Sequence, residues 1–378
     1  MENSLISWCD NTQNFWIGCT RVSPGCLNCY AETLDRNRFS KLLDGGTKDA
    51  PVTHWGKGAP RHRTSVKIWN DPLRWDKIAK AGFFAEVTRA GKFIARGDLR
   101  RLVKAKDAAG VPLIQEGDTV IKVRPRVFCS SLADILDPEV DPKMLAEALD
   151  VIRRCDGLDW LLLTKRPENW RSLMSEAWQH AVSRQGSTEL ANWIRDWMDI
   201  AFKVPPPSNI WMGTTVEDQT RADERIPALL AIPARVRFLS CEPLLGPVEI
   251  RTIADDQGRH AVSLRNPSAN KIHWVICGGE SGSEARPMHP AWARSLRDQC
   301  AAAGVPYHFK QWGAWREPDT CEDEEQAPWV APSGRVFKDV MEIPDDLLGS
   351  AQMFRVGKLA AGRLLDGVEH NAFPEVSR

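Results

Sequence analysis

The chain has 378 residues, of which 43% are hydrophobic and 26% are charged, and this ordinary composition excludes a fibrous or disordered protein. Its 50 Lys and Arg residues balance 50 Asp and Glu residues, which argues against a uniformly basic nucleic-acid wrapper but leaves room for a local basic patch. No apolar run reaches membrane-spanning length, and the first residues lack a secretory signal pattern. We therefore expect a cytoplasmic protein without a membrane partner.

The first forty residues carry the densest group of reactive side chains. Cys19, Cys26 and Cys29 lie within eleven residues, on a segment that contains Gly and Pro. An apolar stretch at 14–18 precedes them, and a helix-like stretch at 30–39 follows. We expect a strand at 14–18, so that the cysteines occupy a strand-to-helix loop.

Three clustered cysteines in a cytosolic chain indicate a metal or redox site. A four-iron cluster with three Cys ligands leaves one iron free for a substrate or cofactor, although four Cys ligands are commoner. A structural zinc site normally closes with four ligands, so zinc would need Cys9, His54 or another distant residue as well. Free buried thiols are a third alternative.

Residues 41–125 are irregular in pattern. Seven Lys or Arg residues and one Asp lie between Arg89 and Lys106. We expect an inserted segment near 76–122, with a helix near 98–108 and a hairpin-like stretch near 112–124. Its basic residues could face a phosphate backbone, but a solvated helix face explains the same residues slightly better.

A regular alternation begins at residue 126. Short apolar runs recur at 126–129, 159–163, 209–212, 236–239, 273–276 and 307–309. Helix-like segments separate most of them, at 142–154, 168–202, 219–231 and 290–303. This alternation predicts an α/β fold, namely a partial or full TIM-like parallel β/α barrel of about six or seven strands. We expect a barrel domain over 1–318 and a C-terminal extension, 319–378, that packs on it.

Polar and ionisable side chains follow nearly every apolar run. In α/β barrels the carboxyl ends of the strands carry the chemistry, so these residues are the site candidates. They are Ser130, Ser131, Asp134, Thr164, Lys165, Arg166, Glu217, Cys241, Glu242, Glu280 and Lys310. Structural roles would explain the same residue types: an N-cap for Asp134, a pair with Glu168 for Lys165 or Arg166, an Arg partner for each glutamate, and core packing for the cysteines.

Eight motifs resemble those of a known family. They are GCTRVSPGCLNCYAE (18–32), LLTKRP (162–167), NIWMGTTVE (209–217), ADERIP (222–227), RFLSCEPLLG (237–246), VICGGESGSEARPM (275–288), HFKQWGAW (308–315) and RVGKLAAGRLLDG (355–367). Together they resemble the three-Cys-motif phage protein family, a domain of unknown function found in phages, prophages and bacteria. The resemblance covers most of the chain apart from roughly 76–122 and 252–270.

The resemblance implies a radical-SAM-like iron–sulfur enzyme with an unassigned reaction and an external electron donor. Cys19, Cys26 and Cys29 would then hold a 4Fe–4S cluster, and S-adenosylmethionine would bind its open iron. The usual spacing in such enzymes is C-x3-C-x2-C, whereas the first interval here is six residues and Tyr30 follows the third cysteine.

Other residues receive cofactor or catalytic roles from the same resemblance. The amine of the cofactor would meet Ser130, Ser131 or Asp134, and its carboxylate would meet Lys165 or Arg166, with Lys310 as a second choice. Thr164 and Glu217 complete the candidate cofactor site. The candidate catalytic residues are Cys241, Glu242, Glu280 and Lys310.

Two further function classes stay open. One is a zinc-stabilised nucleic-acid-binding protein without catalysis. The other is a divalent-metal nuclease that uses Glu217, Glu242 and Glu280. The unknown substrate of the iron–sulfur enzyme could itself be nucleic acid or a nucleotide, because Trp side chains can stack on bases.

Overall fold

The computed structural model describes residues 2, 4–183, 187–199, 204–254, 260, 261, 264, 271–318, 327–344 and 348–375. The end of the helical segment expected at 168–202 and the first residues of the expected C-terminal extension lie outside these ranges. Among the described residues, none of the helices combines the length and the apolar character that crossing a bilayer requires.

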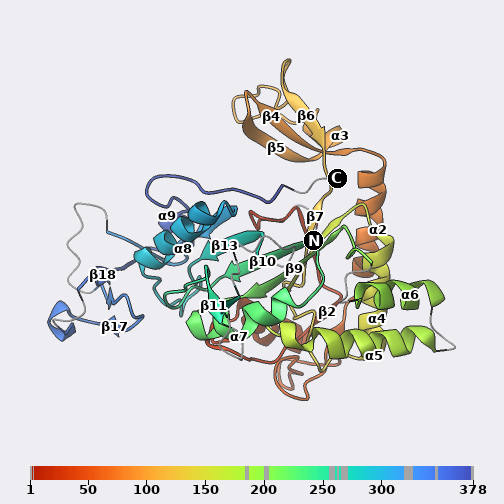
Figure 1. The fold of residues 1–378 in the computed structure, drawn as a ribbon, viewed down its shortest axis with the longest axis horizontal. Helices are drawn as coiled ribbons and strands as arrows, with labels where there is room; N and C mark the ends of the chain where they lie inside the picture. Colours follow the sequence, from red (N-terminus) through yellow and green to blue (C-terminus); the bar gives the residue numbers. More distant parts are fainter. Residues whose placement is uncertain are drawn as a thin grey trace.

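Seven parallel strands form one sheet and follow each other in chain order. They are β1 (Asn11–Gln13), β7 (Arg126–Cys129), β8 (Asp159–Thr164), β9 (Ile210–Thr215), β10 (Val236–Cys241), β13 (Trp274–Gly278) and β14 (Tyr307–Gln311). The sheet curls into a half barrel (Figure 1). Its described strands do not close, because β1 and β14 stand at opposite edges. Of the expected partial or full barrel of about six or seven strands, the structure confirms the partial form, with seven strands in its described sheet.

The prediction of the first strand at 14–18 is wrong. The strand that joins the sheet is β1, three residues earlier, and it pairs with β7. Within 14–18, β2 (Trp16–Ile17) pairs antiparallel with β3 (His62–Arg63) instead. The chain leaves the sheet at Asn14, because the side chain of Asn14 accepts bonds from the backbone N–H groups of Ser131 and Leu132.

From β7 onward, five helices in the described part of the chain connect the strands of the half barrel. They are α4 (Pro142–Arg154), α5 (Trp170–Val182), α6 (Thr188–Trp197), α7 (Gln219–Leu230) and α8 (Pro290–Ala303). Asp141 and Asp218 cap α4 and α7 by accepting backbone N–H bonds. The single segment expected at 168–202 is two helices, which pack on each other through Trp170 and Trp197.

Large aromatic side chains fill the inner face of the half barrel near the amino ends of the strands. Trp8, Phe128, Trp211, Phe238 and Trp274 form one buried cluster there. Phe373, near the C-terminus, packs against Trp274 with the two rings tilted and their centroids 5.0 Å apart, and covers the cluster. Side chains alternate between the two faces of a strand, so Gly213, Ser240 and Gly278 share this inner face nearer the carboxyl ends. The interior therefore changes from bulky and apolar to small and polar along the strands.

A small antiparallel sheet lies apart from the main one, at the top of Figure 1. It comprises β4 (Phe84–Arg89), β5 (Lys92–Asp98) and β6 (Thr119–Lys122), with α3 (Leu99–Leu102) following β5. The helix expected near 98–108 is thus a single turn, and the hairpin-like stretch near 112–124 contributes only β6, which pairs with β4. The pattern of 41–125 also concealed α2 (Val66–Lys80), which contains a proline.

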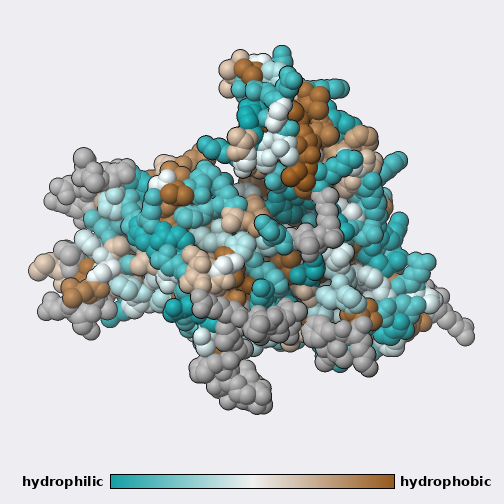
Figure 2. Space-filling view, turned by 45° about the horizontal axis from the view of Figure 1, so that its top comes forward, coloured by the Kyte–Doolittle hydropathy of each residue, from teal (hydrophilic) through white to brown (hydrophobic). Residues whose placement is uncertain are grey.

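This small sheet adjoins the amino ends of the main strands. Arg96 of β5 binds Asp10, the residue before β1, at 3.0 Å, and Arg124 lies 3.5 Å from Asp159 at the start of β8. Figure 2 shows hydrophobic side chains beside hydrophilic ones on its surface, and Val120 and Ile121 are exposed there. The sheet therefore stands at the opposite end of the half barrel from the loop that carries the three cysteines.

The C-terminal residues build small elements beside β14. These are β15 (Trp315–Arg316), β16 (Trp329–Val330), β17 (Val336–Phe337), β18 (Ala351–Gln352), β19 (Phe354–Arg355) and α9 (Lys358–Ala361). The backbone N–H of Phe309 donates to His370 and that of Trp312 to Gly362. These bonds cover the exposed edge of β14 with chain from the C-terminal segment.

Candidate functional site

The three cysteines lie on a loop, residues 18–29, that crosses the carboxyl ends of the strands; we refer to it as the cysteine loop. Cys26 ends a short 3-10 turn and is buried, whereas Cys19 and Cys29 are half-buried. Cys29 directly precedes α1 (Tyr30–Asn37). Side chains that follow several different strands hold this loop in place.

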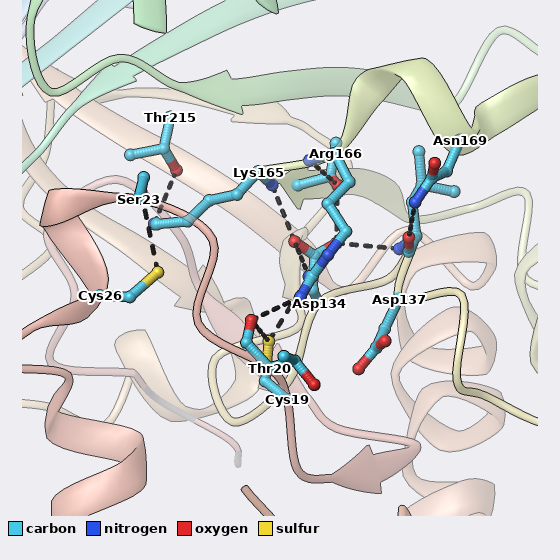
Figure 3. Close-up of polar contacts among 12 residues, drawn as sticks. Cys19, Thr20, Ser23, Cys26, Asp134, Asp137, Lys165, Arg166, Asn169 and Thr215 are labelled. Atoms are coloured by element: carbon cyan, nitrogen blue, oxygen red, sulfur yellow. Dashed lines mark hydrogen bonds and ion pairs between the residues drawn. The ribbon is translucent and has the colours of Figure 1, made fainter. Parts of the chain in front are cut away.

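Arg166, just after β8, makes the deepest of these contacts. Its guanidinium donates to the Cys19 Sγ at 3.5 Å and to the carbonyl of Thr20 (Figure 3). The same guanidinium forms a 3.0 Å ion pair with Asp134, and both side chains are almost fully buried. Burial alone would lower the pKa of Arg166, but Asp134, Cys19 and Asp137 together outweigh burial and raise that pKa. Arg166 is therefore a permanent cation beside the first thiol.

Asp134 has every acceptor position in use. Its carboxylate accepts from the Thr164 hydroxyl at 2.6 Å, from the Lys165 backbone N–H at 2.8 Å and from the Leu136 backbone N–H at 2.9 Å. It thus caps its own turn, as one of the structural alternatives expected, and also fixes the end of β8. Asp134 and Thr164 position Arg166 rather than present free atoms to a ligand.

A second contact joins the cysteine loop to β9. Glu217 is completely buried; its carboxylate accepts from the Ser23 hydroxyl at 2.6 Å and from Arg225 of α7 at 2.8 Å. Gly25 packs so tightly here that an added Cβ would lie 2.5 Å from Glu217. Ser23 is also 3.7 Å from the Cys26 Sγ. Glu217 therefore orders the turn that presents the second cysteine.

The loop after β13 makes a third contact. Glu280 binds Arg286 through both carboxylate oxygens, and Asn28 donates to the same carboxylate at 3.0 Å. Arg286 reaches on to the carbonyl of Pro24 in the cysteine loop, at 3.0 Å. Burial raises the pKa of the Glu280 carboxyl group. The hydrogen bonds from Arg286 and Asn28 together lower that pKa by more, so it lies below its usual value. Glu280 remains ionised and anchors the loop between Cys26 and Cys29.

Lys165 and the pair Glu242–Lys310 are less completely engaged. The Lys165 amine is 3.2 Å from the Thr215 hydroxyl and 3.9 Å from Glu217, and its side chain is 23% exposed. Lys310 binds both oxygens of Glu242, at 2.8 and 2.7 Å, and these two side chains are 19% and 17% exposed. No contact with Glu168 involves Lys165 or Arg166 in the described residues. These three groups can reach a ligand at the rim.

Ser130 and Ser131 follow β7 at the edge of the same rim. Ser130 is buried, and its hydroxyl lies 3.1 Å from the Cys129 Sγ. Ser131 bonds through its backbone N–H to Asn14, and its carbonyl accepts from the Tyr30 hydroxyl. The turn after β7 therefore forms hydrogen bonds with residues on both sides of the cysteine loop, Asn14 before it and Tyr30 after it.

The three cysteines are the candidate metal ligands, and the distances between their sulfurs bear on that role. A tetrahedral zinc site needs sulfurs about 3.8 Å apart, because Zn–S bonds are about 2.3 Å long. In the described part of the chain, these three thiols do not belong to any group of three or more potential metal ligands whose ligand atoms all lie within 4.8 Å of one another. In an iron–sulfur cluster each cysteine binds a different iron, so its sulfurs stand farther apart. The three thiols therefore do not form a preassembled site for a single ion in the described part of the chain.

Burial disfavours the thiolate form of Cys19 and Cys29, and nearby cations favour it. Burial, with a contribution from Asp134, raises the pKa of Cys19 to about 12, and burial also raises the pKa of Cys29. The positive charges of Arg166 and Lys165 act in the opposite direction on Cys19 and Cys29 respectively. Since metals bind the thiolate, these two cations favour the form that a cluster would take.

The remaining cysteines are placed differently. Cys129, Cys241 and Cys277 lie in the outer core with no exposed surface, and burial raises the pKa of each. This environment makes Cys241 an inert thiol rather than an accessible catalytic one. Cys9 is buried in the inner aromatic cluster, and the ring nitrogens of His54 lie against the carboxylates of Asp35 and Asp44.

The three rim glutamates do not converge. Glu217, Glu242 and Glu280 each have a separate cationic partner, in Arg225, Lys310 and Arg286. They are absent from the described groups of potential metal ligands. The geometry therefore does not assemble the shared carboxylate site that the nuclease hypothesis needs.

Sequence reasoning did not single out four residues that organise this site. Asn14 holds the turn after β7, Asn28 holds Glu280, and Arg225 and Arg286 neutralise the buried glutamates. Each arginine lies eight or six residues after its glutamate, inside a motif already noted. The expected Arg partner for each glutamate, which follows from the need of buried carboxylates for cations, points to the two arginines but not to the two asparagines.

Comparison with known proteins gives a family but no reaction. The chain belongs to a family described as protein of unknown function (DUF5131), whose model matches residues 3–374. No curated protein and no solved structure matches the chain significantly.

We expect Asp134→Ala to lower the free energy of unfolding by about 3–5 kcal/mol, because it leaves the buried Arg166 guanidinium without its counter-charge. Urea denaturation followed by circular dichroism measures this loss. Glu139→Gln is the matched control, since Glu139 is more exposed and its contact with Arg61 is longer, at 3.2 Å. A loss below about 1 kcal/mol, as for a surface pair, would contradict the role given to Asp134.

Proposed function

We propose that this chain is a radical-SAM-like iron–sulfur enzyme in which Cys19, Cys26 and Cys29 hold a 4Fe–4S cluster. The observation that carries the proposal is the cysteine loop itself. Buried side chains after β8, β9 and β13 clamp it over the carboxyl ends of the strands, where α/β barrels perform their chemistry. A cytoplasmic location would keep these thiols reduced.

The bound cluster would supply one electron for the reductive cleavage of S-adenosylmethionine. The residues of this chain would bind and orient the cofactor. Lys165 is the best-placed partner for its carboxylate, because the amine of Lys165 is partly exposed and its closest neighbours are a hydroxyl at 3.2 Å and a carboxylate at 3.9 Å. Ser130, Ser131 and the pair Glu242–Lys310 lie on the same rim and are candidates for the amine and the substrate.

The hydrogen bonds and ion pairs that the remaining rim residues form within the protein determine the roles that we propose for them. Arg166, Asp134, Thr164, Glu217 and Glu280 act as positioning residues in this proposal, because their polar atoms already bind one another or the cysteine loop. Glu242 and Lys310 remain the candidate catalytic residues, since their ion pair is the partly exposed one that does not anchor the loop.

We expect the variant in which Cys19, Cys26 and Cys29 are all changed to Ala to lose the iron and sulfide that the wild type takes up on anaerobic reconstitution. The fold should persist, because the aromatic interior and the helices do not depend on these thiols. Iron and sulfide analysis, with circular dichroism, measures both properties. Cys300→Ala is the control, since Cys300 is a buried residue of α8, far in sequence from the cysteine loop. A triple variant that retains a full complement of iron would refute the assignment.

We expect Lys165→Ala to weaken S-adenosylmethionine binding at least about tenfold, because a charged hydrogen bond contributes about 1.5–3 kcal/mol. Isothermal titration calorimetry of the reconstituted protein measures the affinity. Lys143→Ala, on the exposed start of α4, is the matched control and should bind normally. Unchanged affinity in Lys165→Ala would transfer the role to Lys310.

A second candidate function is nucleic-acid binding, and one surface favours it. A cleft between α2 and the turn of α3 is lined by five cations and one carboxylate: Arg74, Lys77, Arg100, Arg101, Lys104 and Asp98. Glu2 neutralises part of this charge through Arg74 and Arg101. The cleft adjoins the amino ends of the strands, so a polyanion held there would be anchored away from the cysteine loop.

We expect the double variant Lys77→Ala/Lys104→Ala to reduce the salt dependence of DNA binding by about two charges, because each lost phosphate contact lowers the slope by about one. Fluorescence anisotropy with a DNA duplex and a single strand, at several salt concentrations, measures the slope. Lys48→Ala, on an exposed loop, is the control. Equal slopes for the double variant and the wild type would remove the cleft from this function.

A further inference from the structure

Two histidines and one aspartate converge beside the cysteine loop without using any of its thiols. Asp44, His54 and His62 each offer one ligand atom, and these atoms all lie within 4.8 Å of one another. The Asp44 carboxylate is 3.1 Å from the His54 Nε2 and 2.9 Å from the His62 Nδ1. The two imidazole rings face each other in a T-shaped arrangement at 5.7 Å.

The buried ring of His54 has a carboxylate at each nitrogen. Its Nδ1 is 2.6 Å from Asp35, and neither side chain is more than 1% exposed. A neutral imidazole carries one N–H donor and one acceptor nitrogen. If Nδ1 donates to Asp35, the lone pair of Nε2 points at the Asp44 carboxylate, and two acceptors then face each other. A metal ion bound to both Nε2 and Asp44 removes this conflict, as does a proton on Nε2.

Asp35 is itself fixed. Its carboxylate accepts the backbone N–H of His54 at 3.1 Å, besides the bond to the ring. A carboxylate that orients the far nitrogen of a histidine is the usual outer partner of a metal-bound imidazole, because it sets the tautomer and raises the basicity of the ligand. Asp35 and His54 thus have the relation that a metal ligand and its support require.

We propose that His54, His62 and Asp44 bind a divalent transition-metal ion of the zinc type. Two imidazoles and one carboxylate suit zinc and its neighbours, whereas Mg²⁺ and Ca²⁺ prefer oxygen ligands alone. The Asp44 and His62 side chains are 37% and 21% exposed, so water can complete the coordination. The site is independent of the cluster proposed for the cysteine loop, and either assignment can fail without the other.

The ion would cross-link the segments that support the cysteine loop. Cys19 forms a β-bridge with Trp55, the residue after His54, and the backbone N–H of Gly56 donates to the carbonyl of Cys19 at 3.0 Å. Gly18 lies so close to His54 that an added Cβ would be 2.5 Å from its carbonyl oxygen. His62 belongs to β3, which pairs with β2 just before the loop. We assign this ion a structural role in holding the first cysteine.

Cobalt titration of the metal-free full-length chain tests the site, because Co²⁺ is visible by absorption and reports its ligands. We expect one Co²⁺ bound with weak visible bands in the variant whose three loop cysteines are changed to Ser, and its displacement by Zn²⁺. Asp44→Asn and His62→Gln should each weaken that binding at least about tenfold, as should the outer variant Asp35→Asn. Asp49→Asn, on the same loop, is the matched control and should bind normally.

If the cysteine variant does not fold, a second measurement tests the same site in the presence of the cysteines. The difference between the cobalt spectra of the wild type and His62→Gln should lack the thiolate charge-transfer band of a cysteine-bound ion. Wild-type affinity in both Asp44→Asn and His62→Gln would overturn the proposal. So would a thiolate band in that difference spectrum, or the absence of cobalt binding from a folded cysteine variant. Loss of the iron–sulfur cluster alone leaves these readouts unchanged.

Discussion

The buried ion pair between Asp134 and Arg166 is the constraint on which the candidate site depends. It spans the ends of two neighbouring strands, since Asp134 follows β7 and Arg166 follows β8. A buried guanidinium is tolerable only beside a fixed carboxylate, and the remaining donors of this one point at Cys19 and Thr20. The buried ion pair of Asp134 and Arg166 at the carboxyl ends of β7 and β8 therefore determines where the first cysteine lies. Glu217 and Glu280 repeat the principle for the rest of the cysteine loop, each with its own arginine.

The chain uses its aromatic residues to separate scaffold from site. The tryptophans and phenylalanines of the inner cluster fill the half barrel near the amino ends of the strands, and Phe373 seals it. Glycine, serine and threonine take the same face nearer the carboxyl ends, so the polar rim lies above a rigid apolar floor. This division places the reactive groups on strand ends whose positions packing has already fixed, as a site that must orient a cofactor requires.

The sequence predicts the strand order and most of the helices well, because buried parallel strands and capped helices leave strong local patterns. The run at 159–163 and the proline-started helix at 142–154 are examples that the structure confirms within a residue. The first strand was misplaced because 14–18 is the more apolar stretch, while pairing selects Asn11–Gln13. The cysteines and the polar rim could be located from spacing alone. Two of their partners could not, because Asn14 and Asn28 act across more than a hundred residues of chain and leave no local signal. Arg225 and Arg286, by contrast, lie only eight and six residues after the glutamates that they bind.

The most direct test of the central claim is electron paramagnetic resonance of the anaerobically reconstituted and reduced wild-type protein, recorded with and without S-adenosylmethionine. We predict the signal of a reduced 4Fe–4S cluster whose shape changes when the cofactor is added, since the cofactor would bind the iron that has no cysteine. A cluster signal that the cofactor leaves unchanged would contradict the cofactor role of the rim. A protein that takes up zinc in the cysteine loop and no iron would contradict the iron–sulfur assignment itself.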